Sequence, residues 1–128
     1  MRILVTGASG FIGSALAKEL EGLGHDVYGL YRYVADGRYN FYQLQKNKIA
    51  DIRDPVGVDR AVGEIKPETV IHLAAMSQVS YSFLAPIEAS EVIYTGTINI
   101  VNACLKHGVS HLINASSSEY YGKQESFP

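Results

Sequence analysis

The sequence predicts an α/β domain built on a doubly wound parallel sheet. Short apolar runs alternate along the chain with segments whose apolar residues recur at helical spacing. The first of these runs leads into a glycine-rich turn that opens a helical segment. Strands that alternate with helices in this way form parallel sheets through right-handed crossovers, so we expect helices on both faces of the sheet. A length of 128 residues suits one domain.

The first half of the chain predicts three strands and two helices. We expect strands at residues 3–5, 27–31 and 49–52, and helices that begin at residues 11 and 55. Gly22 and Gly24 end the first helix, because glycine disfavours helix interiors and accepts the backbone geometry of helix ends. Asp54 is the expected N-cap of the second helix, with Pro55 at the first helical position, where its missing N–H costs nothing.

The second half adds two strands and one long helix. We expect strands at residues 69–73 and 111–115, and a helix from 87 to 106 that is entered by a loop at 74–86. Pro67 ends the preceding helix, and Gly108 is the expected stop signal of the long one. Because no linker or repeat divides the chain, residues 1–128 are predicted to form one domain whose sheet has about five strands.

Composition excludes several functional classes. With 11 Lys and Arg against 13 Asp and Glu, the net charge of −2 provides no field that favours nucleic acid or an anionic membrane. Cys104 has no partner in the chain for a disulfide, and His107 and His111, the spacing closest to a metal site, are separated by a helix end. No apolar run approaches the length of a membrane span, and the first residues lack the pattern of a signal peptide. We therefore expect a cytoplasmic protein without a metal site.

A glycine-rich turn, TGASGFIG at residues 6–13, joins the first strand to the first helix. Gly7 permits the tight turn, Gly10 lets the backbone approach a pyrophosphate, and Gly13 lets the helix pack closely on the strand. The helix N-terminus offers N–H groups and a partial positive charge to the phosphates. These glycines, together with Ser9, Phe11 and Ile12, form the predicted dinucleotide site. The alternative is an ordinary turn between a strand and a helix.

The residue after the second strand bears on the choice of dinucleotide. An acidic residue there would bind the ribose 2′-hydroxyl of NAD, whereas a guanidinium suits the 2′-phosphate of NADP. Arg32 stands at this place and favours NADP, with Arg38 as a second candidate. NAD stays possible, because Asp36 is close enough in sequence to supply the carboxylate and Arg32 can also be read as a solvated loop residue.

Four segments, in order, resemble the extended short-chain dehydrogenase/reductases, the family of nucleotide-sugar epimerases and dehydratases. They are TGxxGFIG at residues 6–13, DIRD at 51–54, LAA at 73–75 and SSSExYG at 116–122, and together they cover almost the whole chain. The resemblance implies a Rossmann fold in which Asp51 and Ile52 contact the adenine. It also implies that Leu73, Ala74 and Ala75 line the ribose and nicotinamide.

Within this family the chain is most similar to the GDP-mannose 4,6-dehydratases, through AAMSQV at residues 74–79, SFxxP at 82–86 and the turn after the fifth strand. The resemblance implies that Ser117 hydrogen-bonds the sugar 4-hydroxyl and that Glu119 is the base that removes the C5 proton of a 4-keto sugar. We expect Glu119 to be partly buried beside the nicotinamide. A polar turn with a solvated glutamate is the alternative.

The resemblance also implies a Tyr-x-x-x-Lys pair, beyond Glu119, and a substrate domain, neither of which lies in residues 1–128. Tyr42 and Lys46 fit the pattern by chance, because they lie between the second and third strands. The chain is therefore expected to be a cofactor-binding part that is inactive alone, with the nucleotide-sugar substrate held by a longer protein. An epimerase or reductase part and a non-catalytic dinucleotide-binding module are the alternatives. An exposed fifth strand would favour a homo-oligomer.

Overall fold

The computed structural model describes residues 1–32, 42 and 44–122 and confirms the parallel sheet. Five strands lie in the order β3-β2-β1-β4-β5, and every neighbouring pair is parallel. Their bounds are β1 (Arg2–Thr6), β2 (Asp26–Tyr31), β3 (Asn47–Ile49), β4 (Thr69–His72) and β5 (His111–Asn114). The chain winds outward from β1 first to one side and then to the other. Ligands of such sheets bind at this switch point, beyond the carboxyl ends of the strands.

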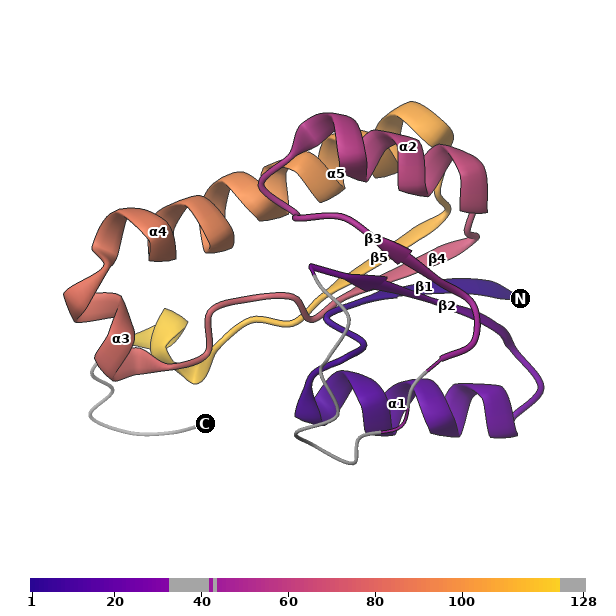
Figure 1. Ribbon diagram of the computed structural model, residues 1–128, viewed down its shortest axis with the longest axis horizontal. Coiled ribbons are helices and arrows are strands. Elements are labelled where there is room, and N and C mark those ends of the chain that lie inside the picture. The colour runs from indigo at the N-terminus through magenta and orange to yellow at the C-terminus, as the bar shows by residue number, and fades with distance from the viewer. Residues whose placement is uncertain (33–41, 43, 123–128) are drawn as a thin grey trace.

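Helices cover the two faces of the sheet (Figure 1). Their bounds are α1 (Phe11–Gly22), α2 (Pro55–Ile65), α3 (Val79–Leu84), α4 (Pro86–Ser90), the π-helical turn η1 (Glu91–Thr95), α5 (Gly96–His107) and the 3₁₀ turn η2 (Ser118–Tyr121). In Figure 1, α1 lies below the sheet, and α2 and α5 lie above it. The side chains of β1 alternate accordingly: Leu4 packs in the cluster with α2 and α5, while Ile3 and Val5 pack with Ala17 of α1.

The long helix of the second half is confirmed, and a short helix before it was not predicted. α4, η1 and α5 follow one another without a break from Pro86 to His107, and Gly108 ends the run with a φ of +67°. The amide of Val109 donates to the carbonyl of Cys104 at this end. α3 lies in the segment predicted as a loop. None of its side chains is buried, so it leaves no apolar periodicity in the sequence.

The third strand was predicted at residues 49–52 and is found at Asn47–Ile49. The prediction rested on Ile52, which is 7% exposed but belongs to the turn after the strand. Its carbonyl accepts a hydrogen bond from Asn99 Nδ2 at 2.9 Å, and its side chain packs against Gly96. In the sequence, a buried apolar residue in a turn looks the same as one at the end of a strand. The predicted strand therefore lay too far toward the C-terminus.

The start of α2 follows the sequence prediction. Asp54 Oδ1 accepts a hydrogen bond from the amide of Val56 at 3.0 Å, and Pro55 occupies the first turn of the helix. The helix ends at Lys66, whose φ of +50° lies in the left-handed region. Cys104 is 5% exposed and packs in the core as a small apolar side chain. In the part of the chain that is described, no helix has the length and apolar character needed to cross a bilayer.

β5 is the outer strand of the described sheet, and it pairs there with β4. The side chain of Ile113 is 55% exposed on this strand. We predict that the 128-residue chain self-associates through this edge, because unpaired strand edges with apolar side chains favour pairing with a second chain. Sedimentation velocity over a concentration series should show a concentration-dependent increase in mass, which Ile113→Lys reduces. A monomer at every concentration would contradict this prediction.

Candidate functional site

The three glycines of the turn differ in their surroundings. Gly7 has a φ of +71°, and a Cβ placed on it would lie 2.9 Å from the amide nitrogen of Ala74. A Cβ on Gly13 would lie 2.2 Å from the carbonyl oxygen of Gly7. Gly10 is exposed, and only the Gly7 carbonyl oxygen, at 3.2 Å, lies near a Cβ there among the described atoms. The roles predicted from the sequence therefore fit the structure. Gly7 permits the tight turn, Gly13 permits the close packing of the helix, and Gly10 leaves the backbone open to a ligand.

The N-terminus of α1 faces the space beyond the carboxyl end of β1. Gly10 is its N-cap and makes no side-chain capping bond, and the first turn carries no acidic residue. The backbone N–H groups of a helix N-terminus and the partial positive charge of the helix favour an anion at this place. Ser9 is half-buried, whereas Phe11 and Ile12 are 77% and 68% exposed. All of the residues predicted to hold a pyrophosphate are thus at one helix end.

A buried histidine joins the end of β4 to β1 and α5. His72 is 3% exposed; its Nδ1 lies 2.6 Å from Thr6 Oγ1, and its Nε2 lies 3.2 Å from Thr97 Oγ1. Thr97 donates its hydroxyl hydrogen to the carbonyl of Ile93 at 2.6 Å, so His72 Nε2 is the donor to Thr97. Nδ1 then accepts from the hydroxyl of Thr6. Burial lowers the pKa of His72 to about 4, which keeps the ring neutral.

Thr6 in turn holds the segment predicted to line the nicotinamide. Its Oγ1 accepts hydrogen bonds from the amides of Leu73 and Ala74, at 3.2 and 3.1 Å. This places Ala74 against Gly7 of the glycine turn. His72 is thus a core histidine whose two ring nitrogens are both hydrogen-bonded. Thr6 was missed, and its only signal was a polar residue between an apolar strand and a glycine turn.

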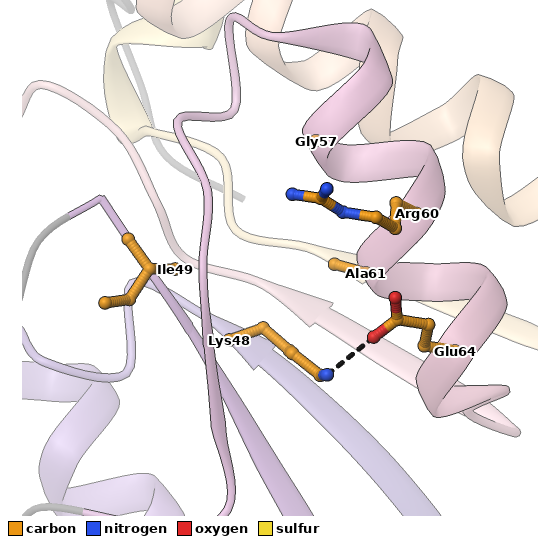
Figure 2. A pocket seen from close by; sticks show the side chains of 6 residues that line it. All are labelled: Lys48, Ile49, Gly57, Arg60, Ala61 and Glu64. Atoms are coloured by element: carbon orange, nitrogen blue, oxygen red, sulfur yellow. Dashed lines mark hydrogen bonds and ion pairs between the residues drawn. The ribbon is translucent and has the colours of Figure 1, made fainter.

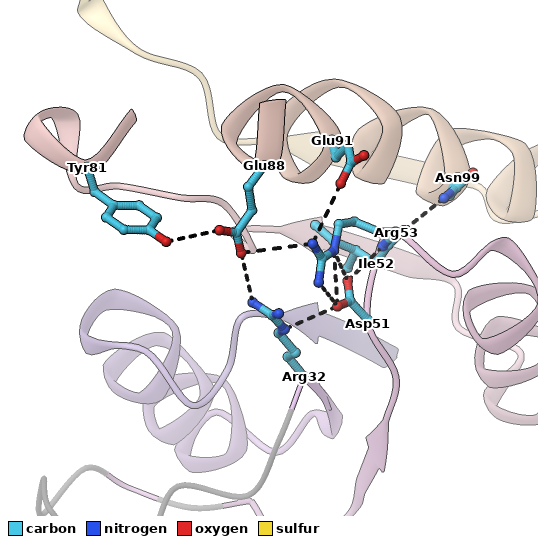
Figure 3. Close-up of polar contacts among 8 residues, drawn as sticks. All are labelled: Arg32, Asp51, Ile52, Arg53, Tyr81, Glu88, Glu91 and Asn99. Atoms are coloured by element: carbon cyan, nitrogen blue, oxygen red, sulfur yellow. Dashed lines mark hydrogen bonds and ion pairs between the residues drawn. The ribbon is translucent and has the colours of Figure 1, made fainter. Parts of the chain in front are cut away.

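A cluster of charged residues lies where β2 ends and α2 begins (Figure 3). Arg53 binds the carboxylate of Asp51 through Nη2 at 2.7 Å and Nε at 3.1 Å, and its amide donates to the same carboxylate at 2.9 Å. Arg32 Nε lies 3.1 Å from Asp51 Oδ2. The guanidinium of Arg53, and more weakly that of Arg32, holds the pKa of Asp51 below its usual value. Asp51 is therefore ionised and engaged by both arginines.

Two glutamates of the long helix complete this charge cluster, which comprises Arg32, Asp51, Arg53, Glu88 and Glu91. Glu88 Oε1 lies 3.8 Å from Arg32 Nη1 and 3.9 Å from Arg53 Nη1. Glu91 Oε2 lies 3.7 Å from Arg53 Nη1. Figure 3 shows these side chains converging from separate segments, which is why sequence reasoning found only Arg32 and Asp51. Arg38 and Asp36 lie outside the described residues.

The serine-rich turn after β5 lies at the same edge of the sheet as the glycine turn, because the amide of Ala115 donates to the carbonyl of His72 at 3.1 Å. Ser117 is the N-cap of η2, and its Oγ accepts a hydrogen bond from the amide of Glu119 at 3.2 Å. Glu119 was expected to be partly buried and is exposed. The described part of this turn has no buried side chain that would hold it against the core, and Tyr120 beside Glu119 is 83% exposed. Glu119 therefore lies in solvent.

Other candidate sites lie away from this edge or are taken up by ion pairs. A pocket of about 220 Å³ is lined by Lys48 and Ile49 of the β3 strand and by residues of α2, where Lys48 binds Glu64 at 2.5 Å (Figure 2). Asp59 pairs with His107 at 2.9 Å. The described residues contain no group of side chains that fits a metal ion. The pocket adjoins the outer strand β3, whereas the glycine turn follows the central strand.

The Tyr-x-x-x-Lys pattern at 42–46 is divided between two carboxylates. Tyr42 donates to Glu21 of α1, and Lys46 binds Asp26 Oδ1 at 2.6 Å, at the beginning of β2. Lys46 thus lies at the amino edge of the sheet, opposite the glycine turn. Tyr42 and Lys46 therefore lie away from the predicted dinucleotide site, as their position between the second and third strands indicates.

Comparison with known proteins gives consistent results. A family model described as the NAD dependent epimerase/dehydratase family matches residues 3–128. The chain is 34% identical over 143 residues to a probable UDP-glucuronate 4-epimerase of Rhizobium meliloti, covering 100% of this chain and 40% of that protein. It therefore spans well under half the length of this curated relative.

Solved structures show the same likeness. The Thermus thermophilus UDP-glucose 4-epimerase in complex with NAD is 38% identical, with a TM-score of 0.80 over 88% of this chain and 36% of that chain. The Thermotoga maritima UDP-glucose 4-epimerase with UDP-glucose is 28% identical, with a TM-score of 0.88 over 99% of this chain and 41% of that chain. The Rossmann-like sheet with its flanking helices is thus shared with these proteins.

Proposed function

Because the chain belongs to the NAD dependent epimerase/dehydratase family, we propose that residues 1–128 are the dinucleotide-binding domain of a cytoplasmic nucleotide-sugar enzyme. The observation that carries this proposal is the close-packed glycine turn that leads into the N-terminus of α1 at the switch point of the sheet, with a glycine as the N-cap. The catalytic Tyr-Lys pair and the substrate domain would belong to further residues of a longer, self-associating protein.

The proposed contacts follow the order of the elements along the sheet edge. The pyrophosphate would lie on the turn at the start of α1, the adenine beside the segment before α2, and the nicotinamide beside the segment after β4. The residues proposed to make them are Gly7, Ser9, Gly10, Phe11, Ile12, Gly13, Asp51, Ile52, Leu73, Ala74 and Ala75. What supports this assignment is that Thr6 holds Leu73 and Ala74 directly against the glycine turn.

Two observations bear on the choice between NAD and NADP. Arg32 follows β2, where a guanidinium suits a 2′-phosphate, and this supports NADP. The charge cluster around it supports NAD, because among the described residues its two guanidinium groups face three carboxylates, which gives a charge of −1. The Thermus relative is in complex with NAD. We propose NAD as the cofactor of the chain, with NADP as the alternative.

Calorimetric titration with NAD and NADP tests this proposal directly. We expect NAD to bind more tightly than NADP. Arg32→Ala should weaken binding of NADP more than binding of NAD, because only NADP brings a phosphate to this residue. Equal losses for the two nucleotides would remove Arg32 from cofactor recognition. If neither nucleotide binds, the domain is not a dinucleotide site.

For the reaction, we propose a 4,6-dehydratase of the GDP-mannose type on the strength of Glu119. Ser117 would hydrogen-bond the sugar 4-hydroxyl, and nicotinamide, when bound, exchanges hydride with the sugar. Glu119 would take the C5 proton of the 4-keto sugar, so that the C6 hydroxyl leaves as water. A 4-epimerase is the second candidate, because the relatives compared above are 4-epimerases. That reaction gives Glu119 no C5 proton to remove.

The complete gene product is needed to decide the reaction, because the chain spans 40% of the curated relative's length. A 4-keto-6-deoxy product from GDP-mannose would support the dehydratase, and the C4 epimer of UDP-glucose would support the epimerase. Glu119→Gln should abolish water loss while the affinity for cofactor stays unchanged. Unchanged turnover would remove Glu119 from the mechanism. Cofactor binding with no product from either sugar would favour a non-catalytic binding module.

A further inference from the structure

We propose that Glu88 occupies the position of a 2′-phosphate between Arg32 and Arg53, and that this carboxylate makes the domain select NAD over NADP. The inference rests on the proposed function, since it concerns the same dinucleotide site. Of the two arginines, the sequence pointed only to Arg32, whereas the structure shows Arg32 and Arg53 converging on one oxygen of Glu88, at 3.8 and 3.9 Å (Figure 3).

The carboxylate of Glu88 is held in this orientation from its other side. Glu88 Oε2 accepts a hydrogen bond from the hydroxyl of Tyr81 at 3.1 Å, while Oε1 faces the two guanidinium groups. The side chain of Glu88 is 32% exposed, so solvent screens the pair only in part. A 2′-phosphate that binds between the two arginines must therefore displace the carboxylate of Glu88.

Asp51 fixes both guanidinium groups around the point that Glu88 occupies. Three hydrogen-bonding groups of Arg53 bind the Asp51 carboxylate, which leaves Nη1 of Arg53 on the side of Glu88. Arg32 contacts Asp51 through Nε and faces Glu88 through Nη1. Two preoriented guanidinium groups around one point are the arrangement that binds a phosphate through paired hydrogen bonds.

The balance of charge decides which ligand this arrangement accepts. With Glu88 in place, the two arginines face three carboxylates among the described residues, and this net charge of −1 disfavours a phosphate. Without the charge of Glu88 the same described cluster is neutral, Nη1 of Arg32 is released from its glutamate, and Nη1 of Arg53 keeps only its contact with Glu91. The 2′-hydroxyl of NAD carries no charge, so its binding depends little on Glu88.

Glu88→Gln tests the inference, with Glu91→Gln as a matched control. Both changes remove one negative charge from the same helix, but Glu91 contacts Arg53 alone, at 3.7 Å, and does not reach Arg32 among the described contacts. The dissociation constants of NAD and NADP are measured by calorimetry for each protein. We expect the preference for NADP relative to NAD to rise about tenfold in Glu88→Gln, and by less than about threefold in Glu91→Gln.

Further variants separate the possible outcomes. In Arg32→Ala/Glu88→Gln the gain should disappear, because the phosphate loses its guanidinium partner. Tyr81→Phe removes only the hydrogen bond that orients Glu88, so a smaller rise is expected even if Glu88→Gln folds poorly. An unchanged ratio in Glu88→Gln, or an equal rise in Glu91→Gln, would overturn the inference while leaving NAD binding intact. Failure of the wild-type chain to bind either nucleotide would overturn the proposed function itself, and this inference with it.

Discussion

Gly13→Ala is expected to destabilise the domain by about 3 kcal/mol and to abolish binding of the dinucleotide. The added Cβ would lie 2.2 Å from the carbonyl oxygen of Gly7 and 2.8 Å from Cα of Ala8. Both are backbone atoms, so no flexible side chain can move aside. The turn is also held from behind, because the amide of Gly7 donates to the carbonyl of Leu30 at 3.1 Å and Gly7 lies against Ala74.

Gly22→Ala is the matched control, since it adds the same methyl group at the other end of α1. No described atom lies within 4 Å of a Cβ at Gly22. Alanine should therefore stabilise the helix by up to about 1 kcal/mol through its higher helix propensity. Urea denaturation measures the free energy of unfolding of both variants, and calorimetry their affinity for NAD. A free energy of unfolding for Gly13→Ala within about 0.5 kcal/mol of the wild-type value would contradict the close packing at Gly13.

The second large effect is a loss of stability in acid that depends on His72. The folded-state pKa is about 4 against an ordinary value of 6.5, because burial disfavours the charged ring. The unfolded chain therefore binds a proton below pH 6.5 that the folded chain refuses until pH 4. The contribution of His72 is fully present above pH 6.5 and is lost as the pH falls through 4. It amounts to about 3 kcal/mol over this window.

His72→Gln isolates this effect, because glutamine has no group that titrates in the window. Its amide offers both an acceptor and a donor to Thr6 and Thr97, the partners of His72. Carboxylates whose pKa is lowered in the folded chain also cost stability in acid, and they do so in both proteins: Asp26, Asp51, Asp59 and Glu64. The difference between the two curves of unfolding free energy against pH should therefore report His72 alone. Parallel curves between pH 4 and 6.5 would show that the ring is not held neutral.

Features encoded locally could be predicted from the sequence. The positive φ of Gly7, the capping of α2 by Asp54 and the helix stop at Gly108 each depend on a residue and its near neighbours. The order of four motifs was enough to predict the family, which the match over residues 3–128 confirms. The choice of a dehydratase over an epimerase depended on Glu119 and on the short segments 74–79 and 82–86, and it stays a proposal.

Features set by distant contacts could not be predicted. The position of β3 depends on its pairing with β2, where Asn47 lies opposite Gly29, and the sequence of the strand does not encode that register. The charge cluster brings Arg32, Arg53 and Glu88 together from segments far apart in the chain. Arg32 alone favoured NADP, and only its three-dimensional neighbours changed the balance. In each case the sequence shows which residue is present, but it does not show which distant residue that residue contacts.

The π-helical turn at Glu91–Thr95 has a consequence for how the long helix is used. A turn of this kind inserts one residue, which offsets the helix beyond it by about 100° in angular phase. Glu88, before the turn, faces the arginines, whereas Thr97, after it, meets His72. The continuous helix thus presents one face to the charge cluster and, beyond the turn, a different face to the buried ring of His72. Insertion or deletion of one residue at this turn would rotate Thr97 relative to Glu88 by about 100° about the helix axis, so the contacts of both residues could not form together.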